Sequence, residues 1–296
     1  MTQYIYQARV RWADQDAQNH VNNVVYLDYL QEARVDWVLD GPHAELLDHG
    51  IAVAAQHVEY LAPAHFGGDG IVIRLWAAHA GGARFTVAYE ICQGDTLVAR
   101  ATTDCAPVDA HTGAVRRLTG SERAWLEDWS GPELHFRALP HADWTAGLGY
   151  AYPVRVRWSE LDPFGHVNNV AFLTFLQEAR IAALEEVRSS EGWGRPGADV
   201  SWLVAAQQIE YRSPMSYRIE PYAAELVVLH VGSSSMSLEV HLRDPQADVL
   251  HAVGRVVLVC ADAQGRPRPI SERVRAALRP LTAPQKRTDR PSGPSH

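Results

Sequence analysis

The segment RVRWADQDAQNHVNNVVYLDYLQEAR, residues 9–34, returns as RVRWSELDPFGHVNNVAFLTFLQEAR at residues 155–180. Sixteen of the 26 aligned positions are identical. Self-similarity over this length is the signature of a duplicated structural unit. The sequence therefore predicts two copies of one domain in tandem, which together form an intramolecular pseudo-dimer.

The repeat extends well beyond this segment and sets the predicted domain limits. VAAQHVEY at residues 53–60 matches VAAQQIEY at residues 204–211. We predict a first domain over residues 1–130, a linker over 131–150 and a second domain over 151–280. Residues 281–296 are rich in Pro, Ser and Arg, a composition typical of disordered tails. The second copy carries extra loop residues around 189–197.

The composition is that of an ordinary soluble protein, with 47% hydrophobic and 21% charged residues among 296. A net charge of -8 argues against nucleic-acid binding. No apolar run is long enough to span a membrane, and the N-terminus lacks the features of a signal peptide. Three cysteines without Cys-x-x-Cys spacing favour neither a disulfide framework nor zinc. We expect a cytoplasmic protein without a metal, another cofactor or a membrane partner.

Each copy reads as a strand, a long helix and four further strands. In the first copy, a strand pattern at 4–12 precedes a helix that begins at Asn22 or Asn23 and ends at Asp40-Gly41-Pro42. Alternating patterns predict strands at 51–60, 71–79, 85–92 and 97–108, and at 202–211, 222–231, 235–243 and 249–260. One helix cannot cover both faces of such a sheet. We therefore predict an α+β fold, in which each curved antiparallel sheet wraps around its helix and the two sheets pair side by side.

The motif before the second helix resembles that of a known family. Asp162-Pro-Phe-Gly-His-Val-Asn-Asn169, followed by Glu210-Tyr211 and Pro214, is similar to hotdog-fold acyl thioesterases of the 4-hydroxybenzoyl-CoA thioesterase type. The first copy lacks the Gly but keeps the Asp, His and both Asn residues. The chain also resembles acyl-carrier-protein thioesterases, in which two hotdog domains share one chain. The resemblance covers most of both copies and implies a tandem hotdog fold.

The resemblance also implies which residues act on the thioester. It places the catalytic carboxylate at Asp16 and Asp162. It places the backbone N–H that polarises the thioester carbonyl at Asn23 and Asn169.

The acyl-carrier-protein branch of the family adds a glutamate, which falls on Glu59 and Glu210. That branch also has an Asn two residues after the Asp. Gln18 and Phe164 stand at those positions here, so the chain departs from that branch at this point.

These residue types suit thioester hydrolysis. A helix N-terminus offers free N–H groups and the positive end of a dipole, which favour negative charge on the carbonyl oxygen. A carboxylate just before the helix can attack directly or activate water. His20 and His166 can hold that water or protonate the leaving thiolate. No His, Cys and Asp cluster has the spacing of metal ligands.

Each candidate also has a structural interpretation. The aspartates can close a turn, the histidines can support the loop, the asparagines can cap the helix, and the glutamates can form ion pairs. Glu32 and Glu178, in the middle of the two helices, are reserve candidates for the carboxylate.

We therefore expect an acyl-CoA or acyl-carrier-protein thioesterase with its acyl chain between the two halves. Arginines such as Arg84, Arg212 and Arg218 are candidates to meet the phosphates of the carrier. The alternatives are a non-catalytic acyl-thioester binding protein, or an enoyl-thioester hydratase or dehydratase on the same fold. One half or both can be active, and the copy at Asp162 matches the motif more fully. Further homo-oligomerisation of the pseudo-dimer is also expected.

Overall fold

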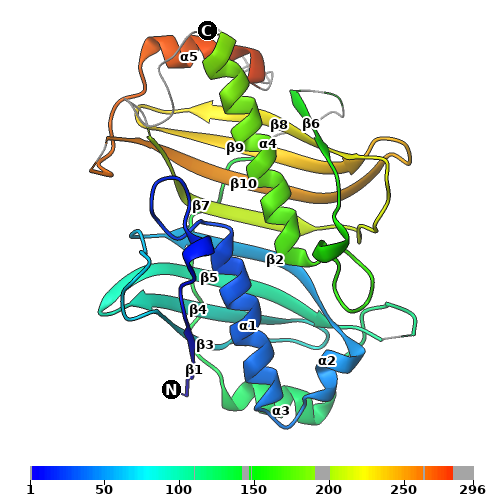
Figure 1. The fold of residues 1–296 in the computed structure, drawn as a ribbon. Coiled ribbons are helices and arrows are strands. Elements are labelled where there is room, and N and C mark those ends of the chain that lie inside the picture. The colour runs from blue at the N-terminus through cyan, green and yellow to red at the C-terminus, as the bar shows by residue number, and fades with distance from the viewer. Residues whose placement is uncertain are drawn as a thin grey trace, which may run out of the picture.

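The protein forms one antiparallel sheet that runs through both halves of the chain (Figure 1). The order of its ten strands is β1-β3-β4-β5-β2-β7-β10-β9-β8-β6. The computed structural model describes residues 2–109, 111–141, 147, 149–190, 201–262 and 264–282.

The first half contains the predicted strand, helix and four strands. They are β1 (Tyr4–Ala8), α1 (Val25–Leu39), β2 (Ile51–Tyr60), β3 (Ile71–Ala80), β4 (Phe85–Gln93) and β5 (Thr96–Pro107). Three shorter elements are a 3-10 turn (Trp12–Asp14), α2 (Glu45–His49) and α3 (Gly120–Asp128). The sequence patterns did not predict α2 or α3.

The second half repeats the same order. Its elements are β6 (Tyr150–Val154), a 3-10 turn (Trp158–Glu160), α4 (Asn169–Ser190), β7 (Ser201–Tyr211), β8 (Tyr222–Val231), β9 (Ser235–Asp244) and β10 (Val249–Ala261). A short helix α5 (Glu272–Leu278) and a 3-10 turn (Arg279–Leu281) follow. The α+β prediction with two tandem hotdog units is confirmed.

The two long helices lie on the same face of the sheet (Figure 1). Leu27, Leu30 and Ala33 of α1 are fully buried against it, and their counterparts on α4, Leu173, Leu176 and Ala179, are buried as well. Burying one leucine side chain contributes about 1.5–3 kcal/mol. A row of such residues at helical spacing therefore fixes which side of each helix faces the sheet.

Strands β2 and β7 join the halves. They pair antiparallel, with Ala55 opposite Glu210 and Val58 opposite Gln207. Each of these strands ends the sheet of its own half. Their pairing at the centre of the ten-stranded sheet therefore leaves neither of them as an exposed edge. The N-termini of α1 and α4 both lie near this junction, and the helices run away from it in opposite directions (Figure 1).

The predicted domain limits stay predictions, but the structure describes part of the segments at them. Residues 131–141 form no helix or strand, and β6 begins at Tyr150. Thr282 forms a bridge with Val228. The rest of the predicted tail, 283–296, lies outside the described residues, as does 191–197 of the predicted extra loop.

Two observations bear on the exclusions drawn from composition. None of the helices in the described ranges is long and apolar enough to cross a membrane. All three cysteines are buried with free thiols.

The helix α3 closes the outer end of the first half and is fixed by a buried carboxylate. The side chain of Thr119 accepts from the N–H of Glu122, and Glu122 accepts in return from the N–H of Thr119. Arg116 donates to both oxygens of the Glu122 carboxylate, at 3.0 and 2.7 Å. These hydrogen bonds to the charged form lower the pKa of Glu122 to about 2.

Glu122→Gln is expected to lower the free energy of unfolding at pH 7 by roughly 1–3 kcal/mol, the usual cost of losing hydrogen bonds to a charged group. Because the folded-state pKa is depressed, this contribution is present above the unfolded pKa near 4.5 and is lost as the pH falls towards 2. Urea unfolding of both proteins from pH 7 down to 3 measures the difference. Glu127→Gln, an exposed carboxylate on the same helix, is the control. A gap of constant size across this range would contradict the assignment.

Candidate active site

A tight turn precedes each long helix, and an aspartate closes it. Oδ1 of Asp16 accepts from the backbone N–H groups of Gln18, at 2.8 Å, and His20, at 3.2 Å. Oδ1 of Asp162 accepts in the same way from the residues two and four positions on, at 2.9 and 3.0 Å. The second carboxylate oxygen of each aspartate accepts no hydrogen bond within the described chain. Each aspartate thus shapes its turn with one oxygen and keeps the other available.

The two histidines of the motif lie in different environments. His20 is half-buried, and its ring meets that of His65 edge-on at 5.1 Å. Burial lowers the pKa of His20, so its ring is neutral at neutral pH. His166 is exposed, and its backbone forms a bridge with Ser216.

The two asparagines of each motif make different contacts. Oδ1 of Asn22 accepts from the N–H of Val24 at 3.1 Å, and Oδ1 of Asn168 accepts from the N–H of Val170 at 3.0 Å. Asn168, directly before α4, therefore caps that helix, whereas Asn22 stabilises the turn that leads into α1.

The next residue of each pair, Asn23 or Asn169, keeps a free backbone N–H. Neither N–H donates to another group in the part of the chain that the structure describes. Each stands at the start of a long helix, where unpaired N–H groups and the helix dipole favour negative charge. Both N–H groups are suited to donate a hydrogen bond to the oxygen of a polarised carbonyl.

The side chain of Asn23 belongs to a closed network between the halves. Its Nδ2 donates to Oε1 of Gln207 on β7 at 3.0 Å. Nε2 of Gln207 donates to the hydroxyl of Tyr60 on β2 at 2.6 Å, and that hydroxyl donates to the carbonyl of Asn23 at 2.7 Å. The second half thus positions the first turn of α1.

The same arrangement recurs at α4 with the roles of the halves exchanged. Nδ2 of Asn169 donates to Oε1 of Gln56 at 3.4 Å. The hydroxyl of Tyr211 lies 2.8 Å from both Oε1 of Gln56 and the carbonyl oxygen of Asn169. Gln56 also donates to Thr103 at 3.4 Å. Each helix start is therefore held by a glutamine from the other half.

Neither glutamine was among the predicted site residues, although the sequence holds a signal. Gln56 and Gln207 are the polar exceptions on the inward face of largely apolar strands, and each has a tyrosine four residues later on that same face. A buried amide needs hydrogen-bond partners. A glutamine at the same position of both copies therefore indicates the same kind of contact in each half. The identity of those partners depends on the pairing of β2 with β7.

Glu59 and Glu210 do not reach the helix starts. Side chains alternate along a strand, so these residues point to the sheet face opposite Tyr60 and Gln207. Glu59 forms an ion pair with Arg100 at 2.8 Å, and Glu210 pairs with Arg255. The reserve candidates on the helices, Glu32 and Glu178, are exposed.

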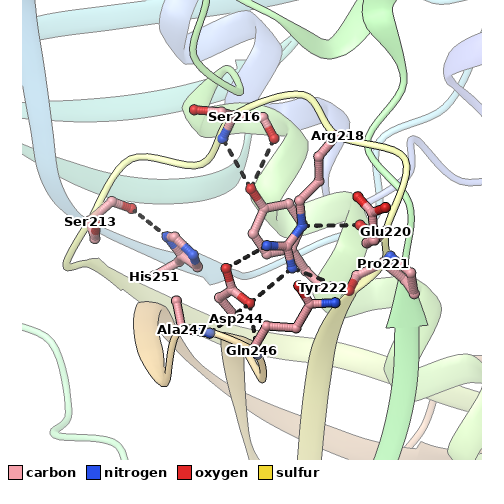
Figure 2. Close-up of polar contacts among 10 residues, drawn as sticks. All are labelled: Ser213, Ser216, Arg218, Glu220, Pro221, Tyr222, Asp244, Gln246, Ala247 and His251. Atoms are coloured by element: carbon pink, nitrogen blue, oxygen red, sulfur yellow. Dashed lines mark hydrogen bonds and ion pairs between the residues drawn. The ribbon is translucent and has the colours of Figure 1, made fainter.

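A polar network supports the turn of Asp162 (Figure 2). Arg218 forms an ion pair with Asp244 and lies over the ring of Tyr222, 3.7 Å from its centroid. The hydroxyl of Tyr222 donates to the carbonyl of Ser216 at 3.0 Å, in the loop that bridges His166.

Two of the three arginines proposed for phosphate binding are thus engaged: Arg218 with Asp244, and Arg212 with Glu210. Arg84 is exposed. Among the described residues, no group of three or more His, Cys, Asp or Glu side chains is placed to hold a metal ion.

The network predicts energetic coupling between the halves. In a double-mutant cycle, Tyr60→Phe and Gln207→Leu are expected to show a coupling of about 0.5–3 kcal/mol in the free energy of unfolding, because they share a hydrogen bond. Tyr60→Phe and Tyr211→Phe, which belong to separate networks, are expected to be additive within about 0.5 kcal/mol. Chemical denaturation of the single and double variants measures both cycles. Additivity in the first cycle would show that the Tyr60–Gln207 hydrogen bond contributes no coupling to the free energy of unfolding.

Comparison with known proteins places this arrangement in a family. The model of the thioesterase-like superfamily matches residues 10–134 and again residues 156–278. An uncharacterized protein, YsmA of Bacillus subtilis (strain 168), is 32% identical over 101 residues, which is 34% of this chain and 65% of that protein.

Two solved structures share the fold over nearly the whole chain. A putative oleoyl thioesterase from Lactobacillus plantarum has a TM-score of 0.72 at 13% identity and covers 91% of this chain and 98% of its own. The 12:0-ACP thioesterase from Umbellularia californica has a TM-score of 0.69 at 13% identity, over 87% of this chain and 94% of its own. With family matches in both halves, the chain belongs to the thioesterase-like superfamily.

Proposed function

We propose that this protein is a thioesterase that hydrolyses acyl-CoA or acyl-carrier-protein thioesters to the free acid and the thiol. One observation carries the proposal. At each end of the β2–β7 junction, a helix start with a free N–H follows a turn whose aspartate keeps one oxygen unbonded. Oxyanion stabilisation and a carboxylate are the two elements that thioester hydrolysis needs.

The chemistry assigns one role to each group. The thioester oxygen accepts from the N–H of Asn23 or Asn169, which stabilises the charge that develops there. The free oxygen of Asp16 or Asp162 takes a proton from a water molecule that attacks the carbonyl carbon, or attacks that carbon itself. The carbon–sulfur bond then breaks, and the thiolate leaves and is protonated. Where the aspartate itself attacked, water then hydrolyses the acyl anhydride to the free acid and restores the carboxylate.

Membership of the superfamily and the fold shared with acyl-ACP thioesterases support a thioester substrate. The protein from Umbellularia californica is named for a 12:0-ACP substrate. Coenzyme A and acyl carrier protein present the thioester on the same phosphopantetheine arm, so the proposal includes both. A cytoplasmic location and further assembly of the pseudo-dimer remain part of the proposal.

A thiol-release assay over a panel of acyl-CoA thioesters tests the function with Asp16→Asn, Asp162→Asn and the double variant. Asparagine keeps the oxygen that closes the turn but lacks the charge, so the fold is expected to be retained. Removing a general base typically costs about 100-fold or more in rate. If both halves are active, each single variant keeps the activity of the other half, and the double variant loses both.

Asp69→Asn, at an exposed turn outside the site, is the matched control. Thermal unfolding of every variant separates loss of chemistry from loss of fold. Full activity in a folded double variant would overturn the assignment of the aspartates. Tight binding of acyl-CoA by the wild type without hydrolysis would favour a binding protein, and addition of water to an enoyl thioester would favour a hydratase.

A further inference from the structure

The exposed aromatic side chains of this protein are gathered around its two candidate sites. Among the described residues, the exposed tryptophan, tyrosine and phenylalanine side chains are Trp12, Phe66, Trp158, Phe164 and Tyr217. They lie in the 3-10 turns that precede the two aspartate turns, in the second of these aspartate turns, or in the loops packed against them. Single exposed apolar residues need no explanation, whereas a cluster beside a candidate site indicates a binding surface.

Four of these rings form the same pair in each half. The ring of Trp12 meets that of Phe66 edge-on, with centroids 5.4 Å apart and an interplanar angle of 87°. Trp158 and Tyr217, at the same places in the repeat, are 5.5 Å apart at 83°. Trp12 is 75% exposed and Trp158 is 73% exposed, so each pair leaves most of an indole open to solvent. We call these two pairs the aromatic platforms.

The loops behind the two platforms are held by different contacts. In the first half, Gln93 donates to the carbonyl of His65 at 2.7 Å and accepts from its N–H at 2.9 Å. In the second half, Asp244 ends β9 as Gln93 ends β4, and it pairs with Arg218 instead (Figure 2). The contacts behind the loops have thus diverged, while the aromatic pairs have kept their geometry. Packing of the core does not explain a surface that is retained in this way.

Each platform has arginines beside its tryptophan. The segment Arg-Val-Arg-Trp occurs at residues 9–12 and again at 155–158, and all four arginines are exposed. Among the described residues, neither Arg9 nor Arg155 forms an ion pair with a carboxylate. Arg155 donates to a backbone carbonyl in the loop of Tyr217, at 3.1 Å, which keeps its guanidinium close to the platform. Each half therefore offers a positive charge to an anion, in a protein whose net charge is -8.

The platforms lie within reach of the candidate sites. Trp12 stands four residues before Asp16, and Trp158 stands four residues before Asp162, so the Cα atoms of each pair are at most about 14 Å apart. An extended phosphopantetheine arm is longer than this distance. A carrier whose thioester lies at the helix start can therefore also contact the platform of the same half.

We propose that each aromatic platform binds the nucleotide of coenzyme A, with the adenine stacked on Trp12 or Trp158 and the phosphates on the arginines beside it. Bases stack on exposed aromatic side chains, and guanidinium groups form charge-assisted hydrogen bonds with phosphates. The inference rests on the proposed function and chooses between its two carriers, because acyl carrier protein presents the same arm without an adenine nucleotide. Two rings at each site match a small ligand, whereas a protein partner would cover about 800 Å² on each side.

Hydrolysis of acyl-CoA, compared with the pantetheine thioester of the same acid, tests the inference. The wild type is expected to have the higher kcat/KM on acyl-CoA. The double variant Trp12→Leu and Trp158→Leu keeps apolar side chains without a ring, and it is expected to lower the ratio of the two kcat/KM values about tenfold. Trp12→Phe with Trp158→Phe keeps a ring to stack on and is expected to retain most of the ratio. Leu39→Ala, an exposed apolar residue at the other end of α1, is the matched control.

A binding measurement does not depend on hydrolysis. Calorimetric titration with ADP, which shares the adenine and the diphosphate of coenzyme A, is expected to show about tenfold weaker binding to the folded leucine double variant than to the wild type. Arg9→Gln with Arg155→Gln is expected to weaken binding too and to reduce its dependence on salt.

The outcomes separate this inference from the proposed function. ADP binding that needs the tryptophans, in a protein that hydrolyses no thioester, would refute only the thioesterase function. Three results would overturn the inference itself: equal ADP binding by the wild type and the leucine double variant, the same kcat/KM ratio in both, or a wild type that prefers acyl-carrier-protein to acyl-CoA.

Discussion

The antiparallel pairing of β2 with β7 is the constraint on which the rest of the structure depends. It merges two curved sheets into one and brings the N-termini of both long helices to the same junction. It also places Gln207 within reach of Asn23, and Gln56 within reach of Asn169. Neither half can complete its own helix start, since the amide partner comes from the opposite strand. The sites are therefore properties of the pair of domains.

Buried amides and hydroxyls make this junction specific as well as stable. A buried polar group without a partner is costly, so Gln207, Tyr60 and Asn23 favour the one register in which all three are satisfied. Each aspartate likewise combines two functions in one side chain. One oxygen closes the turn, which fixes where the carboxylate lies, and the other remains unbonded in the described chain. Structural and chemical roles are thus compatible within a single side chain.

Fusion of the two copies allows the sites to diverge. In an assembly of identical chains, every change appears at both sites. Here Arg34 donates to the hydroxyl of Tyr89, whereas Arg180 lines a small space together with Val240 and Gly254. The second copy, with the more complete motif around Asp162, supplies most of the residues that line this space. The space ends at Asn23, in the copy whose motif lacks the glycine.

The sequence alone determined the duplication, the order of strands and helices and the family motif, because local periodicity and internal identity record these directly. It did not predict α2, α3 or α5, which are too short to show helical periodicity. It offered Glu59 as a site residue, but strand alternation directs this side chain to the other face of the sheet. Only the tertiary structure decided which residues meet at Asn23, because the partners of its side chain come from distant segments of the chain.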